Sequence, residues 1–235
     1  LSYLSAKNIA TASEESGSVT IATTNYKDIT ATLTFHPTDK LVQDGFKFEN
    51  GSVTKTYGDE DFTLTTTGEV KGSTVTYESN APAVATVDGT GKVTIKGAGT
   101  AVITAKASAT EDYDAAAAAC TLTVEKKPIT APAADATVFT YNGTEQTYAL
   151  AEDGAYTITG NKQTNANETG YSVTAALKDT VNTQWADGTT ANKTYTFVIG
   201  KAVITIKAKD QTAYVGDKAP TLGADSCTVS GLVGE

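Results

Sequence analysis

The sequence is poor in the residues on which catalysis and metal binding usually depend. Its 235 residues include no methionine, one tryptophan, two cysteines and a single histidine. One histidine excludes the histidine-rich zinc sites and leaves at most one imidazole base for a nucleophilic triad. We interpret this residue, His36, as a solvated turn residue because it precedes Pro37 at the expected end of a strand. We therefore predict a protein that is not an enzyme, with no catalytic residue, no metal site and no cofactor.

Positive charge is also scarce. Lys and Arg number 18 against 27 Asp and Glu, which gives a formal net charge of -9 at pH 7. Affinity for nucleic acid depends on Lys and Arg that neutralise phosphates, so we expect no nucleic-acid partner. Apolar runs stay far shorter than the roughly 20 residues that span a bilayer, and the start at Leu1 lacks a signal-peptide pattern. We expect no membrane insertion by this segment, with any signal or anchor outside it.

Cysteine is too rare for a disulfide framework. Cys120 and Cys227 fall in different repeat units by the division given below, so we expect each to be a free thiol. Modules of roughly 70 to 90 residues can bury enough surface to fold without disulfides, so the lack of them does not exclude export.

Long helix-period apolar stripes are missing, and short segments rich in Thr, Val, Ile and Tyr take their place. Residues 92–96 (K-V-T-I-K) and 195–199 (Y-T-F-V-I) alternate between two faces, as in half-buried antiparallel strands. The run Ala115–Ala119 is too short for a stable helix, and we interpret it as the start of a closing strand. Turn signals every eight to twelve residues favour two packed sheets, so we predict an all-β protein of β-sandwich modules.

Junctions recur along the chain. T-V-E-K-K-P-I-T at 123–130 and V-I-G-K-A-V-I-T at 198–205 both read as a strand, a Lys and the next strand. A Tyr followed by a turn marks each unit start, at Tyr57, Tyr141 and Tyr214. The sequence therefore contains tandem repeats of one kind of module.

These marks divide the chain into four parts. We expect the C-terminal part of a module, or a small β domain, at 1–41, complete modules at 52–127 and 128–201, and the opening of a further repeat at 202–235. The connections are short and carry a charge or a Pro, so the array should form an elongated, semi-rigid rod. Incomplete modules would expose unpaired strand edges, so head-to-tail self-association is a further expectation.

Residues 79–105 (S-N-A-P-A-V-A-T-V-D-G-T-G-K-V-T-I-K-G-A-G-T-A-V-I-T-A) closely resemble the core of bacterial immunoglobulin-like domains of group 2. In that segment D-G-T-G at 88–91 and G-A-G-T at 97–100 would each reverse the chain. The third part, with F-T-Y-N-G-T-E-Q-T from Phe139, resembles repeats of large surface proteins of gut Firmicutes, and I-T-I-K-A-K-D-Q-T-A-Y-V-G-D from Ile204 resembles a repeat of predicted adhesins.

These resemblances imply tandem immunoglobulin-like modules on the surface of a Gram-positive bacterium. They place the segment outside the cell, in a stalk or adhesin attached to the cell wall through regions beyond it. The group 2 motifs carry no binding or catalytic residue that could be transferred to this chain.

Three side-chain features leave alternatives open. Asp59, Glu60 and Asp61 could bind calcium, but without the D-x-D-x-D-G spacing we favour a solvated face. Trp185 could stack on a sugar or a partner protein, but we favour a core position beside the D-G turn at Asp187. A Lys to Asn cross-link of the kind found in some stalk domains is a third alternative.

The leading functional hypothesis is a non-enzymatic array of surface modules that projects, or forms, a binding region. Its partner would be a protein or glycan of the host or of a cell surface, which the sequence does not identify. In one alternative, a single module is itself the receptor-binding unit for a host glycoprotein, glycan or immunoglobulin, which an exposed aromatic cluster would favour. In another, the modules are spacers of a surface enzyme.

Overall fold

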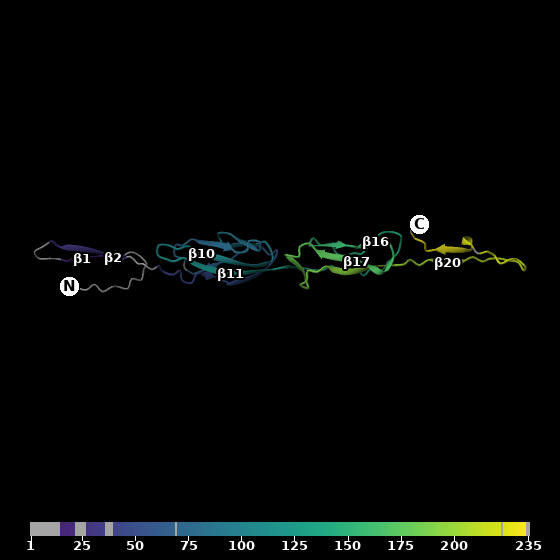
Figure 1. The fold of residues 1–235 in the computed structure, drawn as a ribbon, viewed down its shortest axis with the longest axis horizontal. Coiled ribbons are helices and arrows are strands. Elements are labelled where there is room, and N and C mark those ends of the chain that lie inside the picture. Colours follow the sequence, from purple (N-terminus) through teal and green to yellow (C-terminus); the bar gives the residue numbers. More distant parts are fainter. Residues whose placement is uncertain (1–14, 22–26, 36–39, 69, 222, 234–235) are drawn as a thin grey trace. The chain divides into compact units, whose positions relative to one another are not determined.

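The computed structural model is almost entirely β-strand, so the predicted all-β fold is confirmed (Figure 1). A single 3-10 turn, Ala224–Ser226, is the only helical element in the described residues. Two compact units make up the chain, Leu1–Lys127 and Pro128–Glu235, and each is considered by itself. The structure describes residues 15–21, 27–35, 40–68, 70–221 and 223–233.

The first unit contains an antiparallel hairpin and a β-sandwich. The hairpin pairs β1 (Glu15–Ile21) with β2 (Ile29–Phe35). The strands of the sandwich are β3 (Lys47–Phe48), β4 (Ser52–Thr56), β5 (Phe62–Thr63), β6 (Thr66–Thr67), β7 (Val75–Ser79), β8 (Ala85–Val87), β9 (Lys92–Ile95), β10 (Gly99–Ala107) and β11 (Ala116–Glu125). They form a four-stranded sheet in the order β4-β11-β10-β7, a three-stranded sheet β5-β9-β8 and the pair β3-β6.

One core joins these sheets. Ile103 of β10, Leu122 of β11 and Val93 of β9 are fully buried in it, whereas Thr121 beside Leu122 is exposed. This alternation follows from the strand period of two, which places neighbouring side chains on opposite faces. The alanine run lies largely in β11, which confirms the predicted closing strand.

The D-G-T-G segment forms the predicted reversal between β8 and β9. The Asp88 carboxylate closes it by accepting bonds from the N–H groups of Thr90 (2.8 Å) and Lys92 (3.0 Å). Gly91 has φ +82°, and a Cβ there would lie 2.7 Å from the carbonyl oxygen of Leu64. Only glycine fits this position without displacing the backbone at Leu64.

Residues 40–50, which the prediction left partly unassigned, contact the sandwich that follows them. Leu41 forms a parallel bridge with Tyr113, and Lys40 Nζ donates a hydrogen bond to the Thr110 carbonyl (2.5 Å). Phe46 is buried in the same core. The segment 40–50 therefore belongs to the module that follows it, which we call module 40–127.

A buried amide fixes this entry segment. Gln43 is 4% exposed, and its Nε2 lies within hydrogen-bonding distance of Ser73 Oγ (2.6 Å), Ser108 O (3.0 Å) and Asp114 O (2.9 Å). Such contacts between distant residues cannot be predicted from hydrophobic periodicity, which is a local property of the sequence. That is why residues 42–51 could not be assigned from the sequence.

The second unit contains another sandwich, module 128–201. Its strands are β12 (Lys127–Ile129), β13 (Phe139–Thr140), β14 (Gln146–Thr147), β15 (Tyr156–Thr159), β16 (Lys162–Gln163), β17 (Asn167–Leu177), β18 (Thr183–Trp185) and β19 (Lys193–Gly200). The main sheet has the order β13-β19-β17-β15, and β12-β18 and β14-β16 are separate pairs. As the alternation predicted, Phe197 and Ile199 are fully buried and Thr196 and Val198 are exposed.

The last part of the unit is a single antiparallel pair. β20 (Thr205–Ala208) pairs with β21 (Cys227–Ser230), and all four residues of β20 are exposed. This pair does not form a sandwich of its own among the described residues. The division of the chain into four modules remains a prediction beyond the two units described.

We predict that Leu122→Asp destabilises module 40–127 by about 4 kcal/mol or more, because a carboxylate buried in this core would have no ionic partner. The matched control is Thr121→Asp on the exposed face of the same strand, which should cost at most about 1 kcal/mol. Denaturant unfolding of both variants measures the difference. Equal losses in the two variants would contradict the assignment of the faces.

Candidate binding surfaces

The acidic cluster at residues 59–61 bonds to donors of the chain itself. Asp59 Oδ2 accepts from the Thr56 N–H (2.9 Å), and Asp61 Oδ2 pairs with Lys92 Nζ (3.0 Å). The bond from Lys92 is the main cause that lowers the pKa of Asp61. Within the described ranges, no group of three or more His, Cys, Asp or Glu could hold a metal ion. The solvated-face interpretation accounts for these contacts, and independence from calcium remains a prediction.

The other potentially reactive side chains are those of the single histidine and the two cysteines. His36 lies outside the described residues, so its interpretation as a turn residue stays a prediction. Neither Cys120 nor Cys227 forms a disulfide. Cys120 is fully buried, and burial raises the pKa of its thiol, so this group stays protonated at neutral pH.

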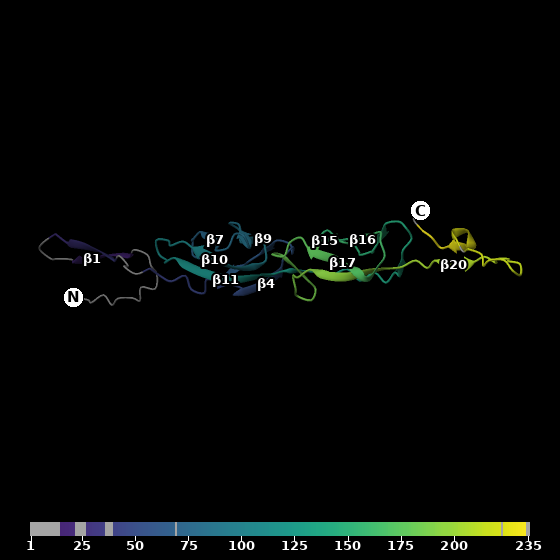
Figure 2. The ribbon, with the colours of Figure 1, turned by 45° about the vertical axis from the view of Figure 1, so that its right-hand side comes forward.

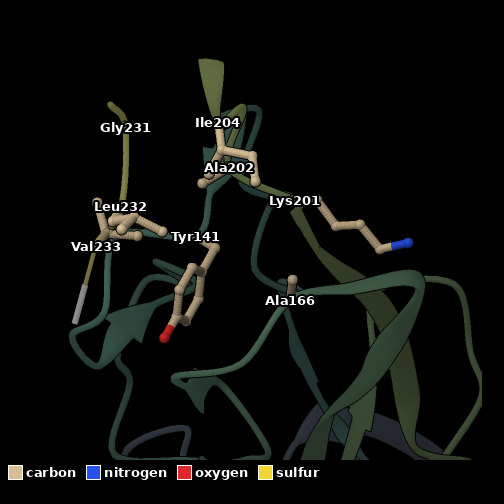
Figure 3. Close-up of a pocket in the computed structure, with 8 residues that line it drawn as sticks. All are labelled: Tyr141, Ala166, Lys201, Ala202, Ile204, Gly231, Leu232 and Val233. Atoms are coloured by element: carbon tan, nitrogen blue, oxygen red, sulfur yellow. The ribbon is translucent and has the colours of Figure 1, made fainter. Parts of the chain in front are cut away.

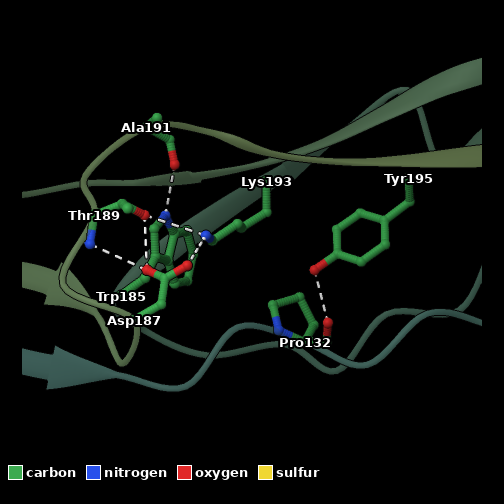
Figure 4. Close-up of polar contacts among 7 residues, drawn as sticks. All are labelled: Pro132, Trp185, Asp187, Thr189, Ala191, Lys193 and Tyr195. Atoms are coloured by element: carbon green, nitrogen blue, oxygen red, sulfur yellow. Dashed lines mark hydrogen bonds and ion pairs between the residues drawn. The ribbon is translucent and has the colours of Figure 1, made fainter.

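Trp185 occupies a core position in module 128–201. It is 1% exposed, and its ring centroid lies 5.5 Å from that of Tyr156. Its indole N–H donates to the Ala191 carbonyl at 2.8 Å (Figure 4). A buried ring with a satisfied N–H cannot stack on a ligand, so the core interpretation is confirmed.

The turn that follows Trp185 is closed by the Asp187 carboxylate. Its Oδ1 accepts from the N–H (3.0 Å) and the hydroxyl (2.7 Å) of Thr189, while Oδ2 pairs with Lys193 Nζ (Figure 4). The hydrogen bond from Lys193 is the largest cause that lowers the pKa of Asp187 to about 2, and the bonds from Thr189 come next. This ionised pair is open to solvent. Because the partner of Lys193 is a carboxylate, the pair does not support a Lys to Asn cross-link at Lys193.

The same local geometry closes several turns. In each, an Asp or Asn Oδ1 accepts the backbone N–H of a Thr two residues later, at 2.8–3.1 Å. The pairs are Asp88 and Thr90, Asp135 and Thr137, Asn142 and Thr144, Asn167 and Thr169, and Asp187 and Thr189. The sequence signal is Asp or Asn, any residue, then Thr. The predicted reversal at residues 88–91 did not include this side-chain acceptor.

The described aromatic side chains are buried or half-buried, with one exception. Tyr148, Tyr156, Trp185 and Phe197 are buried, and Phe197 makes an edge contact with Phe139 at 4.8 Å between centroids. Among the described residues, Tyr214, at 81% exposure, is the one aromatic with a large exposed surface. The aromatic cluster expected of a receptor-binding module is therefore not found in the part of the chain that we describe.

A small hollow of about 290 Å³ lies in the second unit, where the chain leaves β19. Its surface is mostly apolar, and in Figure 3 the amino group of Lys201 points away from Tyr141. That ammonium lies 3.4 Å from a Glu168 carboxylate oxygen. The lining residues are Tyr141, Ala166, Lys201, Ala202, Ile204, Gly231, Leu232 and Val233. The hollow suits apolar contact and offers no constellation for chemistry.

Helices able to cross a membrane are absent from the described residues. The comparison with family models matches residues 64–110 to the intimin immunoglobulin-like domain. This segment contains the strands from β6 to β10, so part of module 40–127 is similar to a bacterial immunoglobulin-like domain. A comparison with the curated proteins finds no significant match.

Solved structures of tandem-domain and surface proteins overlap the chain partially. Mouse protocadherin-24 EC1-3 is 12% identical over 80% of this chain and 79% of its own, with a TM-score of 0.32. A SusE-like surface-located polysaccharide-binding protein of Bacteroides thetaiotaomicron is 14% identical over 70% and 35%, with a TM-score of 0.28. Surface layer protein SbsC, domains 1-6, is 14% identical over 93% and 45%, with a TM-score of 0.30. Similarities of this size identify neither a ligand nor an activity.

We predict that Asp187→Asn changes the acid dependence of stability. The folded-state pKa of about 2 lies below the ordinary 3.8, so ionised Asp187 stabilises the fold above about pH 4, and this contribution is lost as the pH falls toward 2. The difference in Tm between wild type and variant should therefore shrink between pH 5 and pH 2. Thermal unfolding followed by circular dichroism measures it, and a difference independent of pH would contradict the prediction.

Proposed function

We propose that this chain is a non-enzymatic segment of a bacterial cell-surface protein, in which sandwich modules space or present a binding region. The observation that carries the proposal is the way in which modules follow one another. β11 closes module 40–127 at Glu125, and after Lys126 alone β12 opens the next module. The chain thus passes from one module to the next without a separate functional loop or flexible linker at this junction.

The use of the reactive side chains supports the same proposal. Asp61 and Asp187 pair with lysines in turns, Trp185 fills a core, and Cys120 is a buried thiol. These groups have structural partners and none of them faces a cleft. The match to the intimin immunoglobulin-like domain and the resemblance of residues 79–105 to group 2 domains support a surface protein, which we propose to be of Gram-positive type and attached to the cell wall.

The stalk is preferred to a receptor-binding module because Tyr214 alone, among the described aromatic residues, has a largely exposed side chain. Interfaces usually place Trp and Tyr at their energetic centre. The partner of the whole protein, a protein or glycan of a host or of a cell surface, would then contact another region. A surface enzyme that uses these modules as spacers agrees with the same geometry and remains the alternative.

Antibody labelling of the bacterium that makes the protein tests its location. We expect antibodies raised against the 235-residue chain to label intact, unpermeabilised cells, because the modules are proposed to lie outside the envelope. Labelling that requires permeabilisation would contradict the proposal. A glycan array probed with the same chain separates the stalk from the binder, since saturable binding would favour the receptor-binding alternative.

Head-to-tail self-association is a second proposal, which the surface of the C-terminal pair supports. Val203, Ile206 and Val215 are all more than half exposed there, and among the described strands β20 pairs with β21 alone. An edge with exposed apolar side chains is a template for another strand. We expect the mass measured by light scattering to grow with concentration and Ile206→Asp to reduce that growth. A monomer at every concentration would refute it.

A further inference from the structure

An early strand of module 40–127, β4, and its last strand, β11, run in the same direction. β4 pairs in parallel with β11 over five register pairs, from Ser52 with Thr121 to Thr56 with Glu125 (Figure 2). At the ends of this ladder the Thr121 N–H donates to the Gly51 carbonyl (3.0 Å), and the Tyr57 N–H donates to the Glu125 carbonyl (2.8 Å). We call these paired strands, β4 and β11, the terminal ladder of the module.

The entry segment extends this arrangement toward the start of the module. Leu41 bridges Tyr113 in parallel, with hydrogen bonds from the Leu41 N–H to the Asp112 carbonyl (2.8 Å) and from the Asp114 N–H to the Leu41 carbonyl (2.9 Å). The chain thus enters and leaves the module along two neighbouring parallel paths.

Tension along the chain would load this ladder in shear. A pull from both ends draws β4 back toward its N-terminus and β11 forward toward its C-terminus. Because the strands are parallel, they would have to slide past each other, so that all bonds between them carry load together. Strands opened from one end would instead lose their bonds one after another. Resistance to force depends on the unfolding barrier, which shear raises by requiring simultaneous rupture.

Module 128–201 has the same arrangement with a shorter ladder. β13 pairs in parallel with β19 over two register pairs, Phe139 with Ile199 and Thr140 with Gly200. The preceding segment is held apart from this ladder, because β12 pairs with β18 and the Tyr195 hydroxyl donates to the Pro132 carbonyl at 2.6 Å (Figure 4). Fewer backbone bonds would therefore resist sliding between β13 and β19 than between β4 and β11.

We propose that the chain bears tension and that its modules yield in a fixed order, with module 128–201 unfolding before module 40–127. The two parallel terminal ladders, of unequal length, carry this inference. The biological meaning of this inference rests on the proposed stalk function. It adds to that function the load that the stalk carries, which is tension along the chain. Unfolding of the weaker module would lengthen the chain while the stronger one stays folded.

Single-molecule force spectroscopy of the complete chain, held at its two termini, tests the order. At roughly 3.4 Å per extended residue, module 128–201 releases about 250 Å of chain and module 40–127 about 300 Å. We expect the shorter release at the lower force and the longer release at the higher force. Equal forces, or the reverse order, would overturn the proposal.

A pair of proline variants tests whether the ladder sets the force. Amide groups of alternate residues face the partner strand, and the two end bonds show that odd-numbered residues of β4 face β11. Lys55→Pro removes a facing N–H and should lower the force of the longer release below that of the shorter one. Thr54→Pro removes an N–H that points away and should leave the order unchanged. Equal effects of the two prolines would overturn the proposal.

Two controls keep the test independent of misfolding. Lys55→Ala removes the side chain beyond Cβ, including the ammonium that lies 4.9 Å from the centroid of the Phe62 ring, but keeps the backbone N–H, and it should preserve the force order. In the second control the ladder is intact and the force is applied through cysteines at the exposed positions Asp44 and Glu111, with Cys227→Ser. Both positions precede their ladder strands, so this geometry opens the ladder from one end and should need less force. Equal force in both geometries would overturn the shear mechanism.

These measurements use neither a cell nor a ligand. If the modules did not unfold in the expected order of force, the proposed surface location of the chain would not be affected. Failure of antibody labelling would equally leave the mechanical result standing, so the two proposals are tested separately.

Discussion

The closing strand is the element on which each sandwich depends. β11 lies inside its sheet and pairs with β10 on one side and with β4 on the other, and β19 lies in the same way between β17 and β13. Its inward side chains, such as Leu122 and Phe197, are among the largest that are fully buried. One strand therefore joins the first segment of a module to its core, and no disulfide is needed to hold the ends together.

Much of this arrangement could be predicted from the sequence, because it follows from periodicity and turn chemistry. Alternation located the strands around Val93 and Phe197, and the D-G-T-G segment located a reversal. The core position of Trp185 was predicted from the adjacent turn. These features are local, so a window of a few residues contains the information that determines them.

Contacts between distant residues could not be predicted. Nothing near Gln43 indicates that its amide reaches Ser108 and Asp114, some 65 and 71 residues later. The parallel pairing of β4 with β11 could not be predicted from the sequence either, because hydrophobic alternation does not give strand direction. The prediction placed Trp185 in the core, but it did not identify the partners of Trp185 or of Asp61.

The turns closed by Asp or Asn and a following Thr have an evolutionary consequence. Each is completed by atoms of three consecutive residues, as at Asp187 and Thr189, and needs no partner from elsewhere in the module. Such a turn is inherited whole when a gene segment duplicates, and it keeps its shape while the surrounding positions diverge. Repeats of one ancestral module can thus lose recognisable sequence similarity and still connect their strands in the same way.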